Sequence, residues 1–563
     1  MKVGIYNQFL TTMGGGERHM GTVAETLALA GHDVEIVTHV PASIEKLASR
    51  FALDLRGVRL RTTPLLPFDQ LADLSAEYDL WINGSHMSVI PARAPRSILL
   101  VMFPFPLDLS PVGRLKRAVA ERIHRQLLVP RFQEGFFGPQ ELGGTRYRWT
   151  AGRGQVVIET PWRGRALPLR LVLGSFRPAG WEPVTVRLTA NGEPLAEREV
   201  GTTPGNYVTW DVTVPAELAG EREVRLTIES PVFRPFEVGG TSGEPNDFRE
   251  VGVAVARVMT RNVRHYAYEA LFERAVPELS RRLHGLPDLR AMGYLATYDA
   301  ILPISEFSAE WLARYWGQRE RVSILYPPVD VHLYTPRGAR RKVILGIGRF
   351  QKGGHEKKQL EMIRLFRRMV RDGLSGWELH LVGGSMSDAM HRTYLERCRR
   401  AARGLPVTLH VDAPADTLQE LIETSSIYWH ATGYGERDPI KFEHFGISIV
   451  EAMAGGCVPI IAAKGAAAEL VDDGESGYVW ETMAEWRRRT EEVIADEALR
   501  QRLAARAAER ARRFGRDVFR GTLLGVVERL NRDVNRGHGQ ARAAVASTPA
   551  PERAAPIPND AGS

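Results

Sequence analysis

The chain has 563 residues, of which 44% are hydrophobic and 25% charged, and this composition describes a folded protein too long for one hydrophobic core. Two or three domains are therefore expected. The formal net charge of +7 is modest, and the basic residues gather in helical stretches without a nucleic-acid-binding motif, which argues against nucleic acid as a partner. Only Cys398 and Cys457 are present, which excludes a disulfide framework and a thiolate zinc site.

The N-terminus predicts no export signal. Residues 1–6 read as a short apolar strand that runs into a glycine-rich turn, whereas a signal peptide has a charged and then a long apolar segment. The longest apolar region, 446–463, is interrupted by Glu451, Gly455 and Pro459, which favours a buried helix, turn and strand over a membrane span. A cytoplasmic location without membrane insertion is expected.

The first 130 residues alternate between short apolar runs and amphipathic stretches, as in a parallel sheet with crossover helices. A helix is predicted over 17–30, opened by a glycine turn and closed at Gly31. Together with the strands on either side it forms a βαβ unit. Strands are predicted at 3–6, 33–38, 80–83 and 97–102.

A different pattern follows between residues 136 and 255. Apolar residues alternate with period two, and turn signals such as Asn191-Gly192 separate the runs, which predicts an antiparallel β-sandwich. Four tryptophans gather in this module. Aromatic residues in a sandwich are usually core, but they also stack against sugar rings in carbohydrate-binding modules, and the sequence leaves both interpretations open for Trp149, Trp162, Trp181 and Trp210.

The α/β pattern then resumes. A buried strand is predicted over 298–304 and a helix over 308–315, with Ser308 as its N-cap. A second α/β region begins near 343, after a linker around 327–330. Two doubly wound domains leave a cleft at the carboxyl ends of their strands, where such folds bind ligands. Strands of the second region are predicted at 343–348, 378–382, 407–411, 427–430 and 458–461.

The C-terminal part reads as an arginine-rich helix over 495–530, followed by a disordered tail rich in Ala, Pro, Gly and Ser. The predicted fold is thus two Rossmann-like domains with an all-β sandwich inserted in the first. Its predicted boundaries are 1–134 and 258–335 for the N-terminal domain, 135–257 for the sandwich, 336–534 for the C-terminal domain and 535–563 for the tail.

The most informative segment is 443–456, in which Glu443 and Glu451 flank a glycine turn at Gly446. The turn opens a helix, whose free N–H groups and positive dipole end favour a pyrophosphate. Taken alone, the two glutamates could also be one solvated and one ion-paired side chain at an ordinary helix start. For a lone pair of glutamates that second interpretation would be the better one.

This segment resembles the donor-site signature of family 4 glycosyltransferases, which are retaining enzymes of the GT-B fold. The resemblance spans about residues 1–134 and 258–530 and leaves the β-sandwich outside. It implies that Glu451 holds the ribose hydroxyls of the donor and that Glu443 contacts the transferred sugar. It also implies a donor-binding role for Phe445, Gly446 and Ile447.

A second element closes the first strand of the second domain with Gly346-Ile347-Gly348-Arg349. Fixed cations beside a leaving diphosphate stabilise the transition state, although basic residues after a strand are usually surface residues. In the resembled family an arginine here and a lysine a few residues later bind the pyrophosphate. Because this chain has a longer spacing, both Lys352 and Lys357 are candidates; we prefer Lys357, which precedes a predicted helix.

The N-terminal domain supplies further candidates. The Gly14-Gly15-Gly16 turn lacks the spacing of a dinucleotide fingerprint, but the resemblance implies that Gly15 and Gly16 face the donor phosphates and the acceptor. His86 follows a predicted strand, where it could polarise or bind the acceptor or be simply structural. Residues 103–106 also end a strand and could line the acceptor cleft.

Residues 114–128 form a basic amphipathic stretch. It fits either a solvated helix with a core stripe or a peripheral contact with anionic lipid at the inner face of the membrane.

The expected function is transfer of a hexose from a UDP- or GDP-sugar to a glycan or lipid-linked acceptor, with retention, as in polysaccharide or cell-envelope glycan synthesis. No cofactor and no metal are expected, because Arg349 and Lys357 would supply the positive charge. The alternatives are a GT-B phosphorylase or epimerase, and a glycan-binding protein that acts through the sandwich.

Overall fold

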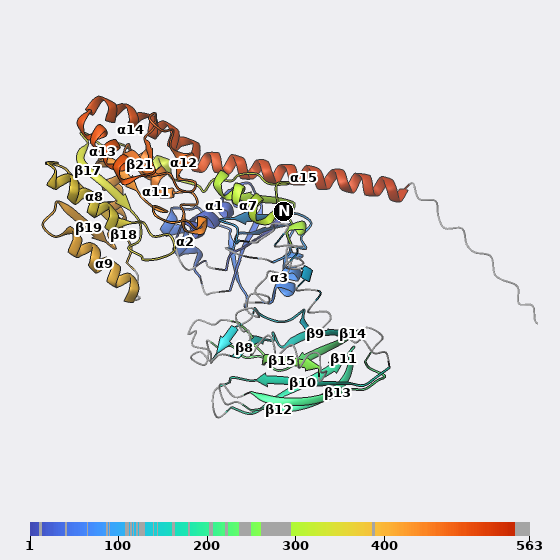
Figure 1. Ribbon diagram of the computed structural model, residues 1–563. Helices are drawn as coiled ribbons and strands as arrows, with labels where there is room; N and C mark the ends of the chain where they lie inside the picture. Colours follow the sequence, from blue (N-terminus) through green and yellow to red (C-terminus); the bar gives the residue numbers. More distant parts are fainter. Residues whose placement is uncertain are drawn as a thin grey trace, which may run out of the picture.

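The computed structural model describes residues 1–106, 130–260 and 294–546 apart from short gaps, and five positions between 112 and 122. The gaps are 9, 11–13, 40–41, 65, 86–87, 89, 139, 143–144, 160–163, 178–180, 202–206, 220–222, 236–248 and 386–388. Three bodies are visible in Figure 1: an N-terminal α/β domain, a C-terminal α/β domain beside it, and a β-sandwich below the first. The last helix, α15, leaves the C-terminal domain and crosses the N-terminal domain.

The N-terminal sheet has six parallel strands in the order β16-β5-β4-β1-β2-β3. Numbered by their occurrence in the domain and read from β3, the strands follow the order 3-2-1-4-5-6 of a doubly wound fold. The chain leaves this sheet after β5 and returns at β16, so the sandwich is an insertion. The bounds are β1 Lys2–Tyr6, β2 Asp33–Thr38, β3 Arg59–Thr62, β4 Leu80–Asn83, β5 Ser97–Val101 and β16 Ala300–Pro303, with α1 Gly15–Leu29, α2 Ile44–Phe51, α3 Phe68–Ser75 and α7 Glu306–Trp316.

The four predicted strands of this sheet up to residue 102 are confirmed, while β3 and the helices α2 and α3 were not predicted. The helix predicted over 308–315 begins earlier, because the N-cap is Ser305 and not Ser308. The Ser305 side chain accepts a hydrogen bond from the Ser308 amide at 3.0 Å. Ser308 lies inside the first turn, where its own hydroxyl donates to the Met102 carbonyl at 2.9 Å.

The C-terminal sheet repeats this arrangement with the order β19-β18-β17-β20-β21-β22, all parallel. The predicted strands are confirmed, and β22 is an addition. The strand bounds are β17 Arg341–Ile347, β18 Glu378–Gly383, β19 Val407–Val411, β20 Ser425–His430, β21 Val458–Ala462 and β22 Tyr478–Trp480. The helices are η4 Val331–Leu333, α8 Gln359–Arg371, α9 Ala389–Ala402, α10 Ala415–Thr424, η5 Pro439–Lys441, α11 Ile447–Ala454, α12 Ala467–Leu470, α13 Met483–Ala495, α14 Glu497–Ala511, η6 Arg512–Phe514 and α15 Arg516–Ala546.

The single arginine-rich helix predicted over 495–530 is wrong, because two residues divide this region into separate helices. Asp496 ends α13 and caps α14, accepting a hydrogen bond from the Leu499 amide at 2.9 Å. Gly515, in an extended conformation, separates η6 from α15. The break turns α15 toward the N-terminal domain, whose core contains five of its side chains: Phe519, Leu523, Val526, Val527 and Leu530.

The end of α15 differs from the predicted tail. The helix continues past Asn535 to Ala546, because good helix formers such as Gln540, Ala541 and Arg542 follow the last glycine of the region. Residues 547–563 lie outside the described part. Within the described residues, no helix is both long and apolar enough to cross a membrane.

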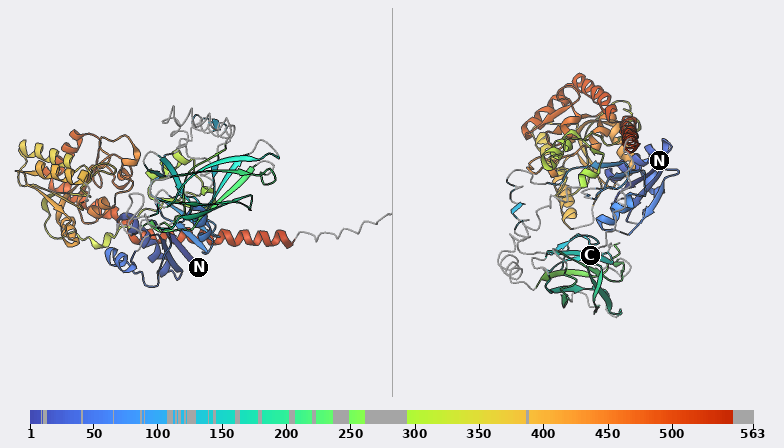
Figure 2. Two further views of the ribbon diagram at one scale, coloured as in Figure 1. Left: turned by 90° about the horizontal axis from the view of Figure 1, so that it is seen from below. Right: turned by 90° about the vertical axis from the view of Figure 1, so that its right-hand side faces the viewer.

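The inserted module is a sandwich of two five-stranded antiparallel sheets, seen edge-on in Figure 2 below the α/β domains in the right-hand view. One sheet has the order β13-β10-β15-β8-β7 and the other β12-β11-β14-β9-β6. The bounds are β6 Arg131–Phe132, β7 Gln140–Leu142, β8 Thr145–Trp149, β9 Arg153–Glu159, β10 Leu167–Gly174, β11 Val184–Ala190, β12 Glu193–Val200, β13 Val208–Val214, β14 Glu223–Glu229 and β15 Ala254–Thr260.

The tryptophans of the module divide between core and surface. Trp149 is fully buried and Trp210 is 7% exposed, so both are core residues, whereas Trp181 is 45% exposed. Trp162 lies outside the described residues. Trp149 and Trp210 are therefore core residues, and the interpretation as a sugar-stacking side chain stays a prediction for Trp181 and Trp162.

Candidate active site

The carboxyl edge of the C-terminal sheet is the place where a ligand is expected. The strand order reverses between β17 and β20, which lie side by side at the centre of the sheet. The chain leaves these strands in opposite directions across the sheet, and doubly wound folds bind ligands in the crevice that this opens. The loops that follow the two strands, 348–358 and 431–446, carry most of the charged candidates.

Two of the predicted residues meet at this edge. The Lys357 ammonium donates a hydrogen bond to Glu443 Oε2 at 2.5 Å. His430, the last residue of β20, has its Nε2 3.0 Å from the same oxygen, and the Thr432 hydroxyl lies 3.0 Å from that nitrogen. Lys352, the competing lysine, pairs with Glu356 at 2.8 Å instead. The geometry thus brings Lys357 to the catalytic candidate and leaves Lys352 outside.

Glu443 is held as a carboxylate by these two neighbours. Burial alone would raise its pKa, but the Lys357 ammonium and the hydrogen bond from His430 outweigh burial and hold the pKa of Glu443 well below its usual value. Burial also lowers the pKa of His430, although Glu443 opposes this. A neutral His430 with its proton on Nε2 fits the donor role toward Glu443.

The turn between Glu443 and α11 explains the glycine in the motif. Gly446 is the N-cap residue and has φ of 109°, a conformation that favours glycine. A Cβ atom there would also lie 2.6 Å from Ile449 Cδ1. The helix starts at Ile447, four residues after Glu443, and the first N–H groups of a helix have no acceptor within it.

The second glutamate of the motif makes a contact between the domains. Glu451 Oε1 accepts a hydrogen bond from Arg18 Nη1 at 2.8 Å. Arg18 lies in the first turn of α1 and also donates to Asp330 Oδ2 at 2.6 Å. Arg18 was not among the predicted site residues. The only signal in the sequence is its position directly after the glycine turn and Glu17.

The glycine turn itself lies against the start of α11. A Cβ atom on Gly15 would lie 3.0 Å from Ile447 Cδ1, and one on Gly16 would meet no atom within 4 Å. Gly15 of the N-terminal domain and Ile447 of the C-terminal domain, both predicted to bind the donor, are therefore neighbours. At Gly16 there is room for a side chain.

Comparisons with known proteins agree with this geometry. The family Glycosyl transferases group 1 matches residues 335–510. Residues 335–510 form a glycosyl transferases group 1 domain. A solved structure of Anabaena Alr3699/HepE in complex with UDP is similar at a TM-score of 0.50 and 13% identity, covering 94% of this chain and all of that one, which confirms the GT-B fold.

Curated relatives are more distant and partial. A GDP-Man:Man(3)GlcNAc(2)-PP-Dol alpha-1,2-mannosyltransferase of Dictyostelium discoideum is 28% identical over 221 residues, covering 37% of this chain and 42% of the relative. A D-inositol 3-phosphate glycosyltransferase of a Nocardioides strain is 25% identical over 287 residues, covering 47% of this chain and 60% of the relative. The chain thus matches roughly half the length of these relatives.

The structure shows no hydrogen bond or ion pair between Glu443 or Glu451 and three other predicted residues, of which one lies outside the described part. Arg349 follows β17 in the group 1 domain, is exposed, and forms no ion pair with any described residue. Phe445 is buried, with its ring 5.7 Å from Tyr326 and 5.6 Å from Phe514 between centroids, so its side chain packs behind the helix start. His86 lies outside the described residues.

Aromatic side chains close the cleft beside Glu443. Phe103, from the loop after β5 of the N-terminal domain, stacks on His444 of the group 1 domain with ring centroids 4.1 Å apart and 6° between planes. Phe307 of α7 stacks in turn on Phe103 at 5.7 Å and on Phe442 at 6.1 Å. The segment predicted to line the acceptor cleft therefore contacts His444 directly, and Phe307 connects it to Phe442 on the other side of Glu443.

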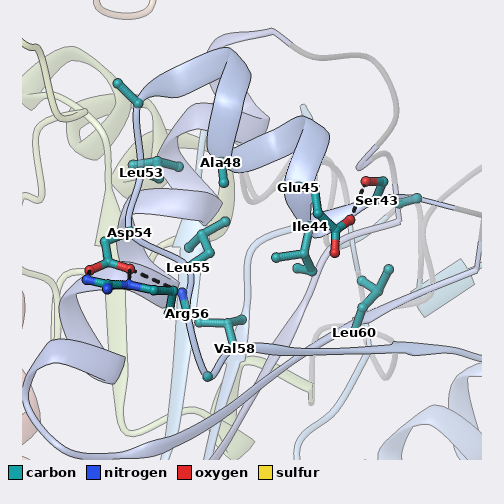
Figure 3. A pocket seen from close by; sticks show the side chains of 13 residues that line it. Ser43, Ile44, Glu45, Ala48, Leu53, Asp54, Leu55, Arg56, Val58 and Leu60 are labelled. Carbon is teal, nitrogen blue, oxygen red and sulfur yellow. Dashed lines mark hydrogen bonds and ion pairs between the residues drawn. The ribbon is translucent and has the colours of Figure 1, made fainter.

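A separate groove of about 1000 Å³ lies at the outer edge of the N-terminal domain, between α2 and β3 (Figure 3). Its polar groups are paired with each other: Asp54 with Arg56 at 2.6 Å, and Ser43 with Glu45 at 2.6 Å. Because β3 is the edge strand farthest from β16, this groove is remote from the strand reversal. Its charged residues pair with near neighbours in the sequence, whereas the edge of the group 1 domain joins Lys357, His430 and Glu443 from separate segments of the chain.

Proposed function

We propose that the protein is a retaining glycosyltransferase that transfers a hexose from a UDP- or GDP-sugar to a glycan or lipid-linked acceptor. One observation carries the proposal: Lys357 and Glu443 pair at 2.5 Å where the strand order of the group 1 domain reverses, beside the amino end of α11. A cation, a carboxylate and free helix amides at one point match the needs of a departing diphosphate and a sugar.

Each side chain has a distinct role in this proposal. Lys357 has three N–H donors, so it can keep its contact with Glu443 while it donates to the diphosphate. Arg349 and the first amides of α11 complete the positive surroundings of that group, and Glu451 accepts the ribose hydroxyls. Glu443, ionised and held by Lys357 and His430, contacts the hydroxyls of the sugar.

The reaction proceeds on one face of the sugar. The bond between the anomeric carbon and the diphosphate oxygen breaks as the acceptor oxygen bonds to the same carbon from the same side. The acceptor proton passes to the departing diphosphate, so no protein nucleophile and no metal take part. Lys357 and Arg349 stabilise the charge that develops on the diphosphate, because fixed cations act strongly at a site shielded from water.

The names of the similar proteins support the two nucleotides and a lipid-linked acceptor. One relative is named as an enzyme that uses GDP-Man and a PP-Dol-linked glycan, another as an inositol phosphate glycosyltransferase, and the HepE structure contains UDP. A lipid-linked acceptor would fit a cytoplasmic enzyme that touches the inner face of a membrane through residues 114–128. Two described side chains there, Leu115 and Val119, are 64% and 48% exposed.

The test is a transfer assay with radiolabelled UDP-glucose, UDP-galactose, UDP-N-acetylglucosamine and GDP-mannose, using extracted lipid-linked glycans and soluble oligosaccharides as acceptors. NMR of the product gives the anomeric configuration, which should equal that of the donor. An inverted product would contradict the mechanism. Turnover that needs free phosphate or proceeds without acceptor would instead indicate a phosphorylase or an epimerase.

A second function is favoured by Trp181, namely glycan binding by the sandwich. Its exposed ring lies 6.2 Å from the Phe233 ring, and the buried Arg177 guanidinium lies 5.0 Å above Phe233. An exposed indole supported by a second aromatic ring can stack on a sugar ring. Affinity electrophoresis in gels containing dextran, mannan or alginate would test this: Trp181→Ala should abolish any retardation and Trp181→Phe should keep it.

A further inference from the structure

Arg18 joins the two domains at the residue that is proposed to hold the ribose. Its side chain comes from α1 of the N-terminal domain, whereas Glu451 belongs to α11 of the group 1 domain. Both are largely shielded, with side chains 12% and 11% exposed. A buried carboxylate needs a partner. In this structure the charged partner of Glu451 is Arg18 of the opposite domain, and Tyr334 is a second, uncharged partner.

Arg18 is itself held in place by a chain of ion pairs. Asp330, in the segment that connects the domains, accepts from Arg18 at 2.6 Å and from Arg516 of α15 at 2.5 Å. Arg516 and Arg520 lie 3.6 Å and 2.7 Å from Glu25 of α1. The guanidinium of Arg18 therefore has a fixed position between two carboxylates, which a planar, forked group suits better than an ammonium does.

The charge state of the pair follows from these contacts. Burial would lower the pKa of Arg18, but Glu451 and Asp330 outweigh it and raise the pKa above its usual value. The arginine stays charged and keeps Glu451 as an acceptor. A carboxylate can accept about four hydrogen bonds, so Arg18 and Tyr334 leave acceptor capacity for the two ribose hydroxyls.

We propose that Arg18 is a positioning residue for nucleotide binding: it fixes the Glu451 carboxylate from the opposite domain so that the ribose meets an oriented and charged acceptor. The inference rests on the proposed function, in which Glu451 holds the ribose. It adds that the nucleotide site of the group 1 domain is complete only when the N-terminal domain is docked against it.

The test measures the affinity for UDP and GDP by calorimetry for four proteins: wild type, Arg18→Gln, Glu451→Gln and the double variant. We expect each single variant to bind about tenfold more weakly, since a hydrogen bond to a charged group contributes on the order of 1.5 kcal/mol or more. The double variant should be no weaker than Glu451→Gln within about twofold, because residues acting through one contact are not additive.

Two further variants separate positioning from a general structural effect. Arg18→Lys keeps the charge but cannot bridge both carboxylates, so its affinity should lie between those of wild type and Arg18→Gln. Arg520→Gln removes the ion pair between Arg520 and Glu25, which belongs to the same series of ion pairs but does not involve Glu451. Arg520→Gln should lower the melting temperature about as much as Arg18→Gln does, but it should leave the affinity for UDP and GDP unchanged.

The outcomes discriminate between the inference and the proposed function. If wild type binds neither nucleotide, or Glu451→Gln binds as well as wild type, the assignment of the donor site fails and the inference falls with it. If Glu451→Gln is impaired but Arg18→Gln binds equally or more tightly, only the inference is overturned. The same holds if the two effects add, because Arg18 would then act independently of Glu451.

Discussion

The two parallel sheets have the same strand order and yet very different chemistry at the point where that order reverses. In the N-terminal sheet the reversal lies between β1 and β4. There Asn83 donates to Ser88 and to the Tyr298 hydroxyl, both at 2.9 Å, and a Cβ atom on Gly84 would lie 1.9 Å from Met20 Sδ. These groups after β4 are neutral and tightly packed, and the charged residues after β1, Glu17 and Arg18, are bound to the Gly14 amide and to Glu451 and Asp330.

The corresponding point of the C-terminal sheet brings charges together. Lys357, Glu443 and His430 converge after β17 and β20, and Arg349 is left without an ion pair among the described residues. The shared topology offers a crevice in both domains, but among the described residues a lysine, a glutamate and a histidine converge on one atom only in the loops of the group 1 domain. Topology therefore predicts where a ligand can bind, and the loop residues decide whether it does.

The largest expected effect is that of removing the cation from the charged crevice. Lys357→Met should lower kcat/KM for transfer by about 10²- to 10³-fold, which is the usual loss when one group that stabilises transition-state charge is deleted. Steady-state kinetics with the best donor measure it. Lys352→Met is the matched control, because Lys352 pairs with Glu356 and its side chain is 47% exposed; a change of more than about threefold there would reverse our choice between the lysines.

A substitution at the reversal of the N-terminal sheet should lower the stability of the protein but leave its affinity for nucleotides unchanged. Asn83→Ala removes the donor to the Tyr298 and Ser88 hydroxyls and the acceptor of the Ser85 amide, so we expect a loss of about 1–3 kcal/mol in the free energy of unfolding. Urea denaturation and calorimetry with UDP or GDP check both parts. Weaker nucleotide binding by a folded Asn83→Ala protein would mean that both crevices take part in donor binding.

The smallest expected effect is a shift in pH dependence. The depressed pKa of Glu443 keeps it ionised, so activity that needs the carboxylate is present above that pKa and is lost as the pH falls through it. His430→Phe removes one of the groups that lower this pKa while burial still raises it. The acid limb of the kcat/KM profile should therefore move to higher pH. His430→Gln, which keeps an N–H donor, should leave the limb near its wild-type position.

Much of the fold followed from sequence periodicity, because buried parallel strands are nearly continuous apolar runs. All the long strands of both sheets were predicted, whereas β3 was missed because Arg59 and Arg61 interrupt its apolar pattern. The break at Gly515 was missed because a glycine between arginine-rich stretches does not reveal an extended conformation. That break determines whether α15 joins the core of the N-terminal domain.

The sequence pointed to the candidate residues that lie close together in one motif, but it did not reveal the contact between the two domains. Glu443 and Gly446 are neighbours in one motif, and Lys357, preferred over Lys352 by its position before a helix, lies beside Glu443 in the structure, while its contact with a phosphate stays a prediction. Arg18 could not be predicted, because its partner Glu451 is 433 residues away and the contact exists only once the domains dock. The role of His86 stays a prediction, since it lies outside the described residues.

The central claim is that the group 1 domain holds a nucleoside diphosphate between the Lys357 loop and the first turn of α11. A crystal structure of the protein with UDP or GDP tests it most directly. The account predicts density for the diphosphate within hydrogen-bond distance of Lys357 and of the Ile447 amide, and for the ribose at Glu451. Nucleotide density in the N-terminal crevice or in the groove beside α2, with the Lys357 loop unoccupied, would contradict it.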